Sequence, residues 1–396
     1  VSSLGANTTG DCNVGVGRSA LRNNTTAGDN TAIGTNSLFS NTTGAVNTAV
    51  GFCSLYSNTT AANNTAVGRR ALAANTEGTE NTSLGANSLC ANTTGCRNTA
   101  VGFEAGKANT TGVENTFIGR KAGLEATTTD NLTAIGSFAL SAAVTGANNT
   151  AVGKSALAAN TSGSENVAIG SFAGDSNTTG SGNIFIGKEA GQANTTASGN
   201  VAIGQNTFDA NSTGTRNTAV GSAALGANTT GNENASFGNL SLDANTTGCK
   251  NNGFGDSSLT ANTTGCCNVA IGNAALSSNT TASENVAVGI NALASNTTGT
   301  RNVAVGFSAM LCNTSANDNT AVGRCAMKLT TTGTNNTAMA KDALVFNTTG
   351  TENTAIGKSA LYVNTTGNSN TAVGCGSLDA NTTASQNTAM GYESMG

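Results

Sequence analysis

The stretch Asn47-Thr48-Ala49-Val50-Gly51 is the unit from which the rest of the chain is built. It returns as Asn64-Thr65-Ala66-Val67-Gly68, and its large apolar residue recurs every 17 residues from Val16 to Met390. We number positions from that residue, so that Val50 is at position 0 and Gly51 at position +1. No insertion or deletion interrupts the 22 intervals, and a fixed internal period of this kind is the signature of a repeat architecture.

Composition excludes several classes of protein. The 396 residues include no Pro, Trp or His, and only 10% are charged. A net charge of −4 on a chain of this length makes nucleic acid an unsuitable partner, and no run approaches the ~20 apolar residues of a membrane span. Without His there can be no Ser-His or Cys-His pair, and phosphate-binding glycine motifs are missing. We therefore predict no enzyme activity, no cofactor, no metal site and no membrane span in this segment.

The repeat predicts an all-β fold, a parallel β-solenoid of 17-residue coils. Strand geometry sends positions −2 and 0 to one side and positions −1 and +1 to the other. Because position 0 is always large and apolar, we expect it to face inward, with position −2 at least half buried and the Ala/Gly face smooth and outward. A second apolar stripe, Ala-Leu at positions +4 and +5, is also expected inside, although Gly replaces Leu in four repeats (Gly106, Gly123, Gly174 and Gly191).

Two further positions are nearly constant. Position +1 is Gly in every repeat except at Ala340, which indicates a positive φ or a close backbone approach. Position −3 is Asn in every repeat except at Leu132, and stacking at about 4.8 Å would make these residues a hydrogen-bonded ladder.

Residues 1–396 are predicted to be a single continuous array. Residues 1–15 read as an irregular, short first coil, because the pair Leu4-Gly5 is followed by Val16-Gly17 only 12 residues later. Both ends of the sequence fall within a repeat, so we expect a piece of a longer fibre.

The repeat also resembles a known family. The run Asn166-Val-Ala-Ile-Gly170 followed by Ala173-Gly174 resembles the head repeats of trimeric autotransporter adhesins, the YadA-like heads, and the Asn-Thr-Ala-Val-Gly repeats of tail-fibre and surface proteins. The resemblance covers essentially the whole chain, although the 17-residue unit is longer than the usual adhesin head unit. It implies a left-handed parallel β-roll, three chains side by side and a role as a surface adhesin.

Position +8 opens a turn of the type Asn-Thr-Thr-Gly, which is also an N-glycosylation acceptor sequence. Such a turn is expected to be exposed, so one hypothesis is a column of covalently attached glycans along one edge, and the alternative is that Asn and Thr serve only as turn formers. Asn131 and Asn234 carry the motif at other positions. The candidate acceptors of the column are Asn7, Asn24, Asn41, Asn58, Asn92, Asn109, Asn160, Asn177, Asn194, Asn211, Asn228, Asn245, Asn262, Asn279, Asn296, Asn313, Asn347, Asn364 and Asn381.

The chain has ten cysteines. Cys249 and Cys266 share position −5 in adjacent coils, and one rung of separation suits the Cα distance of a disulfide, so we predict that bond. Two other pairs are plausible, Cys90 with Cys96 and Cys312 with Cys325. The alternative is that these cysteines are small buried residues that replace Ser or Ala.

Taken together, the pattern favours a structural extracellular fibre that is N-glycosylated at its turns and associates with itself beside or along the fibre axis. The resemblance implies that this association is a homotrimer. The alternative is a surface adhesin or phage tail-fibre segment that binds a host surface. Either function places the chain outside the cell or on a cell or virion surface. Ice binding by an outward threonine array is a third hypothesis, which we disfavour because Val and Ile replace Thr at position −2 and are expected to point inward.

Overall fold

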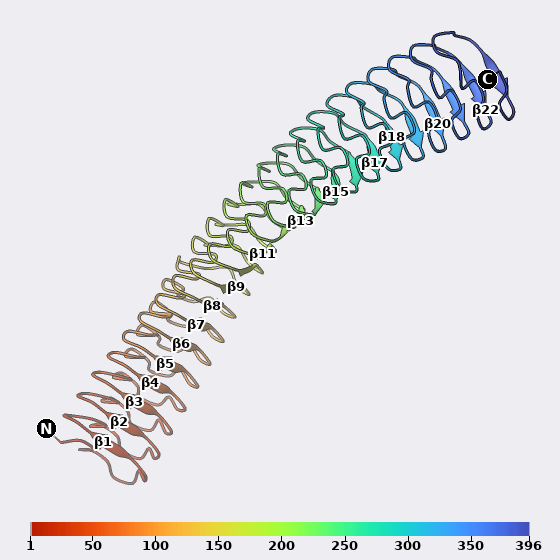
Figure 1. Ribbon diagram of the computed structural model, residues 1–396. Helices are drawn as coiled ribbons and strands as arrows, with labels where there is room; N and C mark the ends of the chain where they lie inside the picture. Colours follow the sequence, from red (N-terminus) through yellow and green to blue (C-terminus); the bar gives the residue numbers. More distant parts are fainter. Residues whose placement is uncertain (1, 396) are drawn as a thin grey trace. The chain divides into compact units, whose positions relative to one another are not determined.

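The computed structural model describes residues 2–395, and these contain 23 strands of three residues each and no helix (Figure 1). The chain divides into two compact units, Val1–Gly199 and Asn200–Gly396, which we call the N-terminal and C-terminal units. The N-terminal unit holds β1 (Val14–Val16), β2 (Thr31–Ile33), β3 (Thr48–Val50), β4 (Thr65–Val67), β5 (Thr82–Leu84), β6 (Thr99–Val101), β7 (Thr116–Ile118), β8 (Thr133–Ile135), β9 (Thr150–Val152), β10 (Val167–Ile169) and β11 (Ile184–Ile186).

The C-terminal unit repeats the same arrangement. It holds β12 (Val201–Ile203), β13 (Thr218–Val220), β14 (Ala235–Phe237), β15 (Asn252–Phe254), β16 (Val269–Ile271), β17 (Val286–Val288), β18 (Val303–Val305), β19 (Thr320–Val322), β20 (Thr337–Met339), β21 (Thr354–Ile356), β22 (Thr371–Val373) and β23 (Thr388–Met390).

Within each unit, consecutive strands pair in parallel and in register with an offset of 17 residues. In the pair β2 and β3, Thr31 lies beside Thr48 and Ile33 beside Val50. In the pair β16 and β17, Ile271 lies beside Val288 in the same way. The prediction of a parallel β-solenoid with 17-residue coils is therefore confirmed, and equivalent side chains form columns along each unit.

The predicted orientation of the strands is wrong. The alanine at position −1 is fully buried, as at Ala49, whereas the large residue at position 0 points outward and is 41% exposed at Ile33 and 55% exposed at Val16. The interior of a 17-residue coil is narrow, and the Ala-Leu stripe and two asparagine columns already fill most of it. A methyl group at position −1 fits the remaining space, so the branched side chain at position 0 lies outside.

Phe117 shows how narrow that interior is. It is one of two phenylalanines at position −1, and its ring is fully buried. A Cβ added at Gly106 or Gly123, the position +5 residues of adjacent coils, would overlap that ring. Phe185 is placed in the same way, with its ring against Gly174 and Gly191. The inward ring therefore occupies the space of two leucines, which explains the four glycines at position +5.

The Ala-Leu stripe at positions +4 and +5 is buried as predicted, with Ala20 and Leu21 both at 0% exposure. It is not a strand, because Leu21 adopts a left-handed conformation with a φ of 48°. Its N–H still donates across coils, to the carbonyl of Ser37 at 3.0 Å. The prediction for position +1 is also confirmed: Gly51 has a φ of 135°, and a Cβ there would lie 2.5 Å from the carbonyl oxygen of Gly68.

Residues 2–15 do not form an irregular coil. Leu4 N–H donates to the Ala20 carbonyl at 3.0 Å, which is the same bond that Leu21 makes to Ser37, and Leu4 has the same left-handed backbone, with a φ of 51°. Leu4 therefore lies at position +5 and not at position 0. The 17-residue register already holds at the start of the described chain.

Candidate functional site

Both asparagine columns lie inside the coil. At position −3, the N–H of Asn47 donates to Asn30 Oδ1 at 2.9 Å, and Asn47 Nδ2 donates to the Ala61 carbonyl at 2.9 Å, which confirms the predicted ladder. At position +8, Asn41 Nδ2 donates to Asn24 Oδ1 at 2.8 Å and to the Gly44 carbonyl at 2.9 Å. The expectation that the turn asparagine is exposed is therefore wrong.

This burial bears directly on the glycan hypothesis. A glycan on Nδ2 would replace one of two hydrogens that are both donated inside the coil, so attachment would require the turn to open. Asn7 is exposed and Asn381 is half-buried, because each lies in the outermost coil of its unit. The other candidate acceptors all have 0% exposure: Asn24, Asn41, Asn58, Asn92, Asn109, Asn160, Asn177, Asn194, Asn211, Asn228, Asn245, Asn262, Asn279, Asn296, Asn313, Asn347 and Asn364.

The structure exposes acceptor motifs at a different corner. Position −4 adopts a left-handed conformation at the surface, and Asn63, Asn131, Asn148 and Asn335 occupy it, each two residues before a threonine. Of the two additional candidates from the sequence, Asn131 is therefore exposed, whereas Asn234 lies in the position −3 column and is 2% exposed.

The position +8 column is broken at three coils, by Ala126, Ala143 and Thr330. Ala126 and Thr330 replace asparagine, and the side-chain oxygens that the missing amides would reach, Asn109 Oδ1 and Asn313 Oδ1, are buried without a hydrogen-bond partner. Thr330 Oγ1 is also buried and unpaired. A buried acceptor left without a donor costs about 1–3 kcal/mol, so these breaks are local weak points of the interior.

Cys249 and Cys266 lie one above the other at position −5. Their Sγ atoms are 3.0 Å apart, and the N–H of Cys249 donates to Cys266 Sγ at 3.1 Å. The hydrogen bond between the two thiols raises the pKa of Cys249 to about 11. All ten cysteines are free thiols in the structure, so the disulfide stays a prediction, one for which the two sulfurs are already adjacent.

No hydrogen bond joins the two sulfurs within either of the other cysteine pairs, Cys90 with Cys96 and Cys312 with Cys325, among residues 2–395. Cys96 Sγ accepts a hydrogen bond from the N–H of Thr79 at 3.3 Å, whereas Cys90 lines a surface hollow. Position −5 side chains accept an N–H from the preceding coil elsewhere too, as Ser181 Oγ does from Ser164 at 3.1 Å. Cys96 and Cys266 therefore stand where a serine hydroxyl accepts in other coils, which is consistent with the alternative that cysteine replaces Ser.

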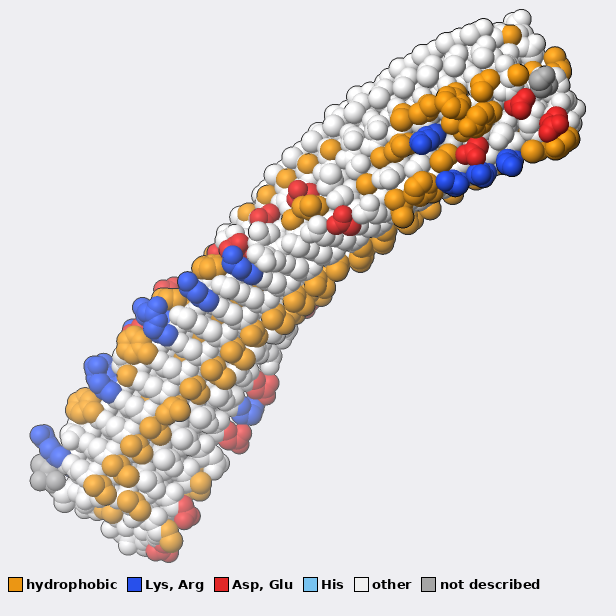
Figure 2. Space-filling view, in the orientation of Figure 1, with side chains coloured by type: hydrophobic (Ala, Val, Ile, Leu, Met, Phe, Trp, Pro, Cys, Tyr) orange, Lys and Arg blue, Asp and Glu red, His pale blue; other side chains and the backbone are white. Residues whose placement is uncertain are grey.

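The outward strand face runs along the whole N-terminal unit. It consists of two columns, position −2 and position 0, and Figure 2 shows the apolar position 0 column running along the unit. Position −2 is threonine in eight consecutive coils, from Thr31 to Thr150, and these side chains are exposed or half-exposed. Val167 and Ile184 continue the column and also point outward, so our reason for disfavouring ice binding is wrong.

Charged side chains follow the two edges of this face (Figure 2). We call the edge after the strand, at positions +2 and +3, the basic edge, and the edge before it, at positions −5 and −4, the acidic edge. The exposed cations of the basic edge are Arg18, Arg69, Arg70, Arg120, Lys154 and Lys188, of which Lys188 pairs with Glu189 at 3.2 Å. The exposed or half-exposed acids of the acidic edge include Asp29, Glu80, Glu114, Asp130 and Glu165.

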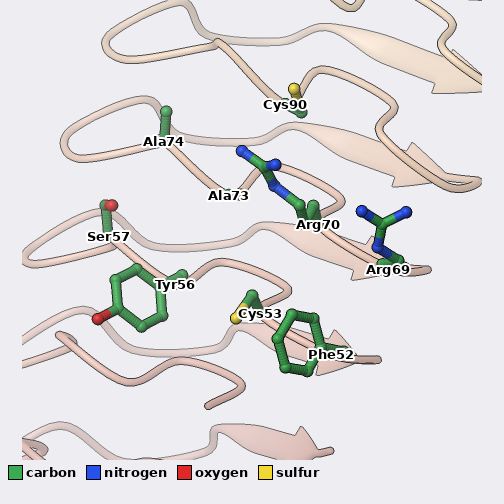
Figure 3. Close-up of a pocket in the computed structure, with 9 residues that line it drawn as sticks. All are labelled: Phe52, Cys53, Tyr56, Ser57, Arg69, Arg70, Ala73, Ala74 and Cys90. Atoms are coloured by element: carbon green, nitrogen blue, oxygen red, sulfur yellow. The ribbon is translucent and has the colours of Figure 1, made fainter. Parts of the chain in front are cut away.

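A hollow of about 430 Å³ lies on the basic side of the N-terminal unit (Figure 3). Ala73 and Ala74 line it together with larger side chains of the same coil and of the coils on either side. Neither Arg69 nor Arg70 forms an ion pair within residues 2–395. Besides the two alanines, the hollow is lined by Phe52, Cys53, Tyr56, Ser57, Arg69, Arg70 and Cys90.

The fold and these surfaces define the chain as a repeat protein of the parallel β-solenoid class. No known protein-family model matches it, and no curated protein matches its sequence. Among the described residues there is no group of three or more Cys, Asp or Glu side chains that could hold a metal ion, and none of them forms a helix that could cross a membrane.

Proposed function

We propose that the chain is a structural protein of an extracellular fibre, located outside the cell or on a cell or virion surface. The observation that carries the proposal is the unbroken 17-residue register, in which every strand pairs in parallel with the next one within each unit. Each coil contacts its neighbours through backbone ladders and two amide columns. Such an interior gives a regular, stiff scaffold and leaves few long loops from which a catalytic pocket could be built.

Electron microscopy of the purified full-length chain tests this role. We expect filaments of uniform width, and diffraction from aligned filaments should show a meridional repeat near 4.8 Å, the spacing between parallel strands. Compact globular particles without that repeat would contradict the proposal. The experiment needs no binding partner, so its outcome is independent of any ligand.

The hollow beside Arg69 and Arg70 favours a second candidate function, adhesion to a host surface, which is also what the YadA-like resemblance implies. Aromatic rings stack on sugar faces, and unpaired guanidinium groups bind carboxylate or sulfate in a bidentate manner. The candidate ligand is therefore an acidic surface glycan. Binding of sulfated and carboxylated glycans on an array should disappear in the variant Arg69→Ala/Arg70→Ala and persist in the matched variant Arg324→Ala/Lys358→Ala. Equal loss in both variants would show nonspecific charge attraction.

The outward threonine column favours a third candidate, ice binding, because Thr31 to Thr150 form a regular hydroxyl and methyl array at the surface. Inhibition of ice recrystallisation by the purified chain would support this candidate, provided that replacing the middle of the column (Thr82→Lys/Thr99→Lys) abolishes the effect. Ordinary ice growth in the presence of the unmodified chain would exclude it.

A further inference from the structure

The outward strand face of the N-terminal unit exposes apolar surface along its whole length. Eleven position 0 side chains lie on it, among them Leu84 at 48% exposure and Ile118 at 36%, with the threonine column beside them. The exposed area of these two columns is comparable to the surface that each partner buries in an interface of standard size, about 800 Å². Exposed apolar area of this extent, bordered by charged residues, is typical of a surface that a protein partner covers.

The spacing of charges across the face is regular. Apart from Lys188, which pairs with Glu189, each exposed cation on the basic edge is followed 10 or 11 residues later by an acid on the acidic edge. The cation and the acid therefore lie on opposite sides of the face and less than one coil apart along the axis. None of these matched residues forms an ion pair within the described chain. The four matched sets are Arg18 with Asp29, Arg69 and Arg70 with Glu80, Arg120 with Asp130, and Lys154 with Glu165.

The charged residues that lie on the edge of opposite sign are each paired within the chain. Glu104 is an acid on the basic edge, but Lys107 Nζ lies 2.9 Å from its carboxylate, which lowers the pKa of Glu104 and holds it as a paired anion. Arg97 is a cation on the acidic edge, and Glu114 pairs with it at 2.9 Å. Arg120 packs over the ring of Phe138, with the guanidinium carbon 4.4 Å from the ring centre, and this contact holds the cation in place.

Symmetry decides which second copy fits this face. If two copies face each other about a two-fold axis parallel to the coil axis, the basic edge of one lies opposite the acidic edge of the other at the same level. If the axis is perpendicular to the coil axis, so that the copies are antiparallel, each basic edge meets a basic edge. Like charges facing each other oppose association, so the arrangement of charges selects the parallel orientation.

We infer that two copies of this chain pair face to face through the outward strand face of their N-terminal units, parallel and without axial stagger. Each matched set then forms two contacts, one on each side of the pair. The threonine and position 0 columns of the two copies pack between the edges, with the two strand layers about 10 Å apart as in other stacked sheets. This inference rests on the proposed structural role, to which it adds the partner and the orientation.

Charge reversal tests the pairing. The acid-reversed variant is Glu80→Lys/Glu165→Lys, and the base-reversed variant is Arg69→Asp/Lys154→Asp. Both changes suit the local backbone, since Lys250 already occupies position −4 and Asp256 position +2 in other coils. Each variant alone turns four attractive contacts of the pair into repulsive ones, so sedimentation should show dissociation constants weakened on the order of 100-fold or more. The swap Arg97→Glu/Glu114→Arg is the matched control and should associate like the unmodified chain.

A 1:1 mixture of the two reversed variants gives the sharpest result. At the two altered levels, the introduced lysines of one variant then face the introduced aspartates of the other, and its native Arg69 and Lys154 likewise meet native acids, so the mixture should form heterodimers although neither variant associates alone. Carbodiimide cross-linking of isotopically mixed unmodified chains should join Lys154 of one copy to Glu165 of the other. A monomeric unmodified chain, a trimer, or reversed variants that associate unchanged would each overturn the pairing. Any of these outcomes with the 4.8 Å repeat retained would leave the structural role standing.

Discussion

Replacing Thr330 with asparagine should repair a break in the interior of the C-terminal unit. The backbone there is already that of an intact coil: the N–H of Thr330 donates to the Met327 carbonyl at 3.1 Å, just as that of Asn313 donates to Met310 at 3.1 Å. A new amide at this position would donate to Asn313 Oδ1, which now has no partner, and to the Gly333 carbonyl. Its own oxygen would accept from Asn347 Nδ2, whose single bond at present is to Gly350 at 3.0 Å.

The size of the effect follows from these three bonds. Satisfying the buried oxygen of Asn313 removes a penalty of about 1–3 kcal/mol, and each of the other two bonds contributes about 1 kcal/mol. Loss of the unpaired Thr330 hydroxyl adds to the gain. We therefore expect Thr330→Asn to stabilise the surrounding coils by about 3–5 kcal/mol.

Hydrogen exchange is the suitable assay, because coils in a repeat array can open locally. Amide protection between Asn313 and Gly350 should rise in Thr330→Asn, and the midpoint of unfolding in denaturant should rise with it. Thr330→Ala is the control, since it removes the hydroxyl without supplying a donor, and Asn296→Thr should reproduce the break in an intact region. If Thr330→Asn leaves protection unchanged while Asn296→Thr lowers it, the unpaired oxygen of Asn313 is not the cause of weakness at this site.

Four further predictions concern other parts of the chain. Gly123→Leu should destabilise the fold by about 1–3 kcal/mol through overlap with the Phe117 ring, and Phe117→Ala in the same chain should restore most of that loss; additive effects in a thermal-unfolding cycle would contradict the packing. Cys249 should react with iodoacetamide more slowly than the exposed Cys267 at pH 9, because its raised pKa keeps the thiol protonated. The hydrogen bond between Cys249 and Cys266 should for the same reason stabilise the fold fully below the ordinary thiol pKa of about 8.5, and this stabilisation should disappear as the pH rises through about 11. A mild oxidant should join Cys249 to Cys266, and peptide mapping that finds both still alkylatable would refute the bond. Secreted from a eukaryotic host, the chain should carry glycans at Asn63, Asn131, Asn148 or Asn335 in preference to the buried column, and mass mapping with the opposite preference would show that the turns are modified before they close.

The sequence predicted the period, the parallel register, the reason for glycine at position +1 and the ladder at position −3, because each depends only on equivalent residues stacking. It failed at the orientation of the strand, where the larger apolar side chain was assigned to the interior. The correct signal was present in the sequence: Phe117 and Phe185 at position −1 occur only where position +5 is glycine in two adjacent coils. A large residue at position −1 that occurs only beside small residues at position +5 shows that both positions face the same interior. The hydrophobicity of a residue does not by itself show which way it faces.

The glycan hypothesis failed in its premise for a related reason. Asn-Thr-Thr-Gly is a turn sequence, and turns are usually exposed, but a coil this narrow needs polar groups inside to satisfy its own turn carbonyls. Asn41 does so with both hydrogens of its amide. The charges on the two edges of the outward face were visible in the sequence, yet their meaning depended on knowing which side of the strand faces solvent.

The amide columns also give each stack of coils a polarity. In the position +8 column the amide-to-amide bonds all run toward the lower-numbered coil, as from Asn58 Nδ2 to Asn41 Oδ1, whereas the threonine hydroxyls at position +9 donate toward the higher-numbered coil, as Thr42 does to the carbonyl of Thr59. A stack therefore has a donor-rich end and an acceptor-rich end for each column. Two stacks could fuse into one only head to tail, and a junction of like ends would leave every column mismatched.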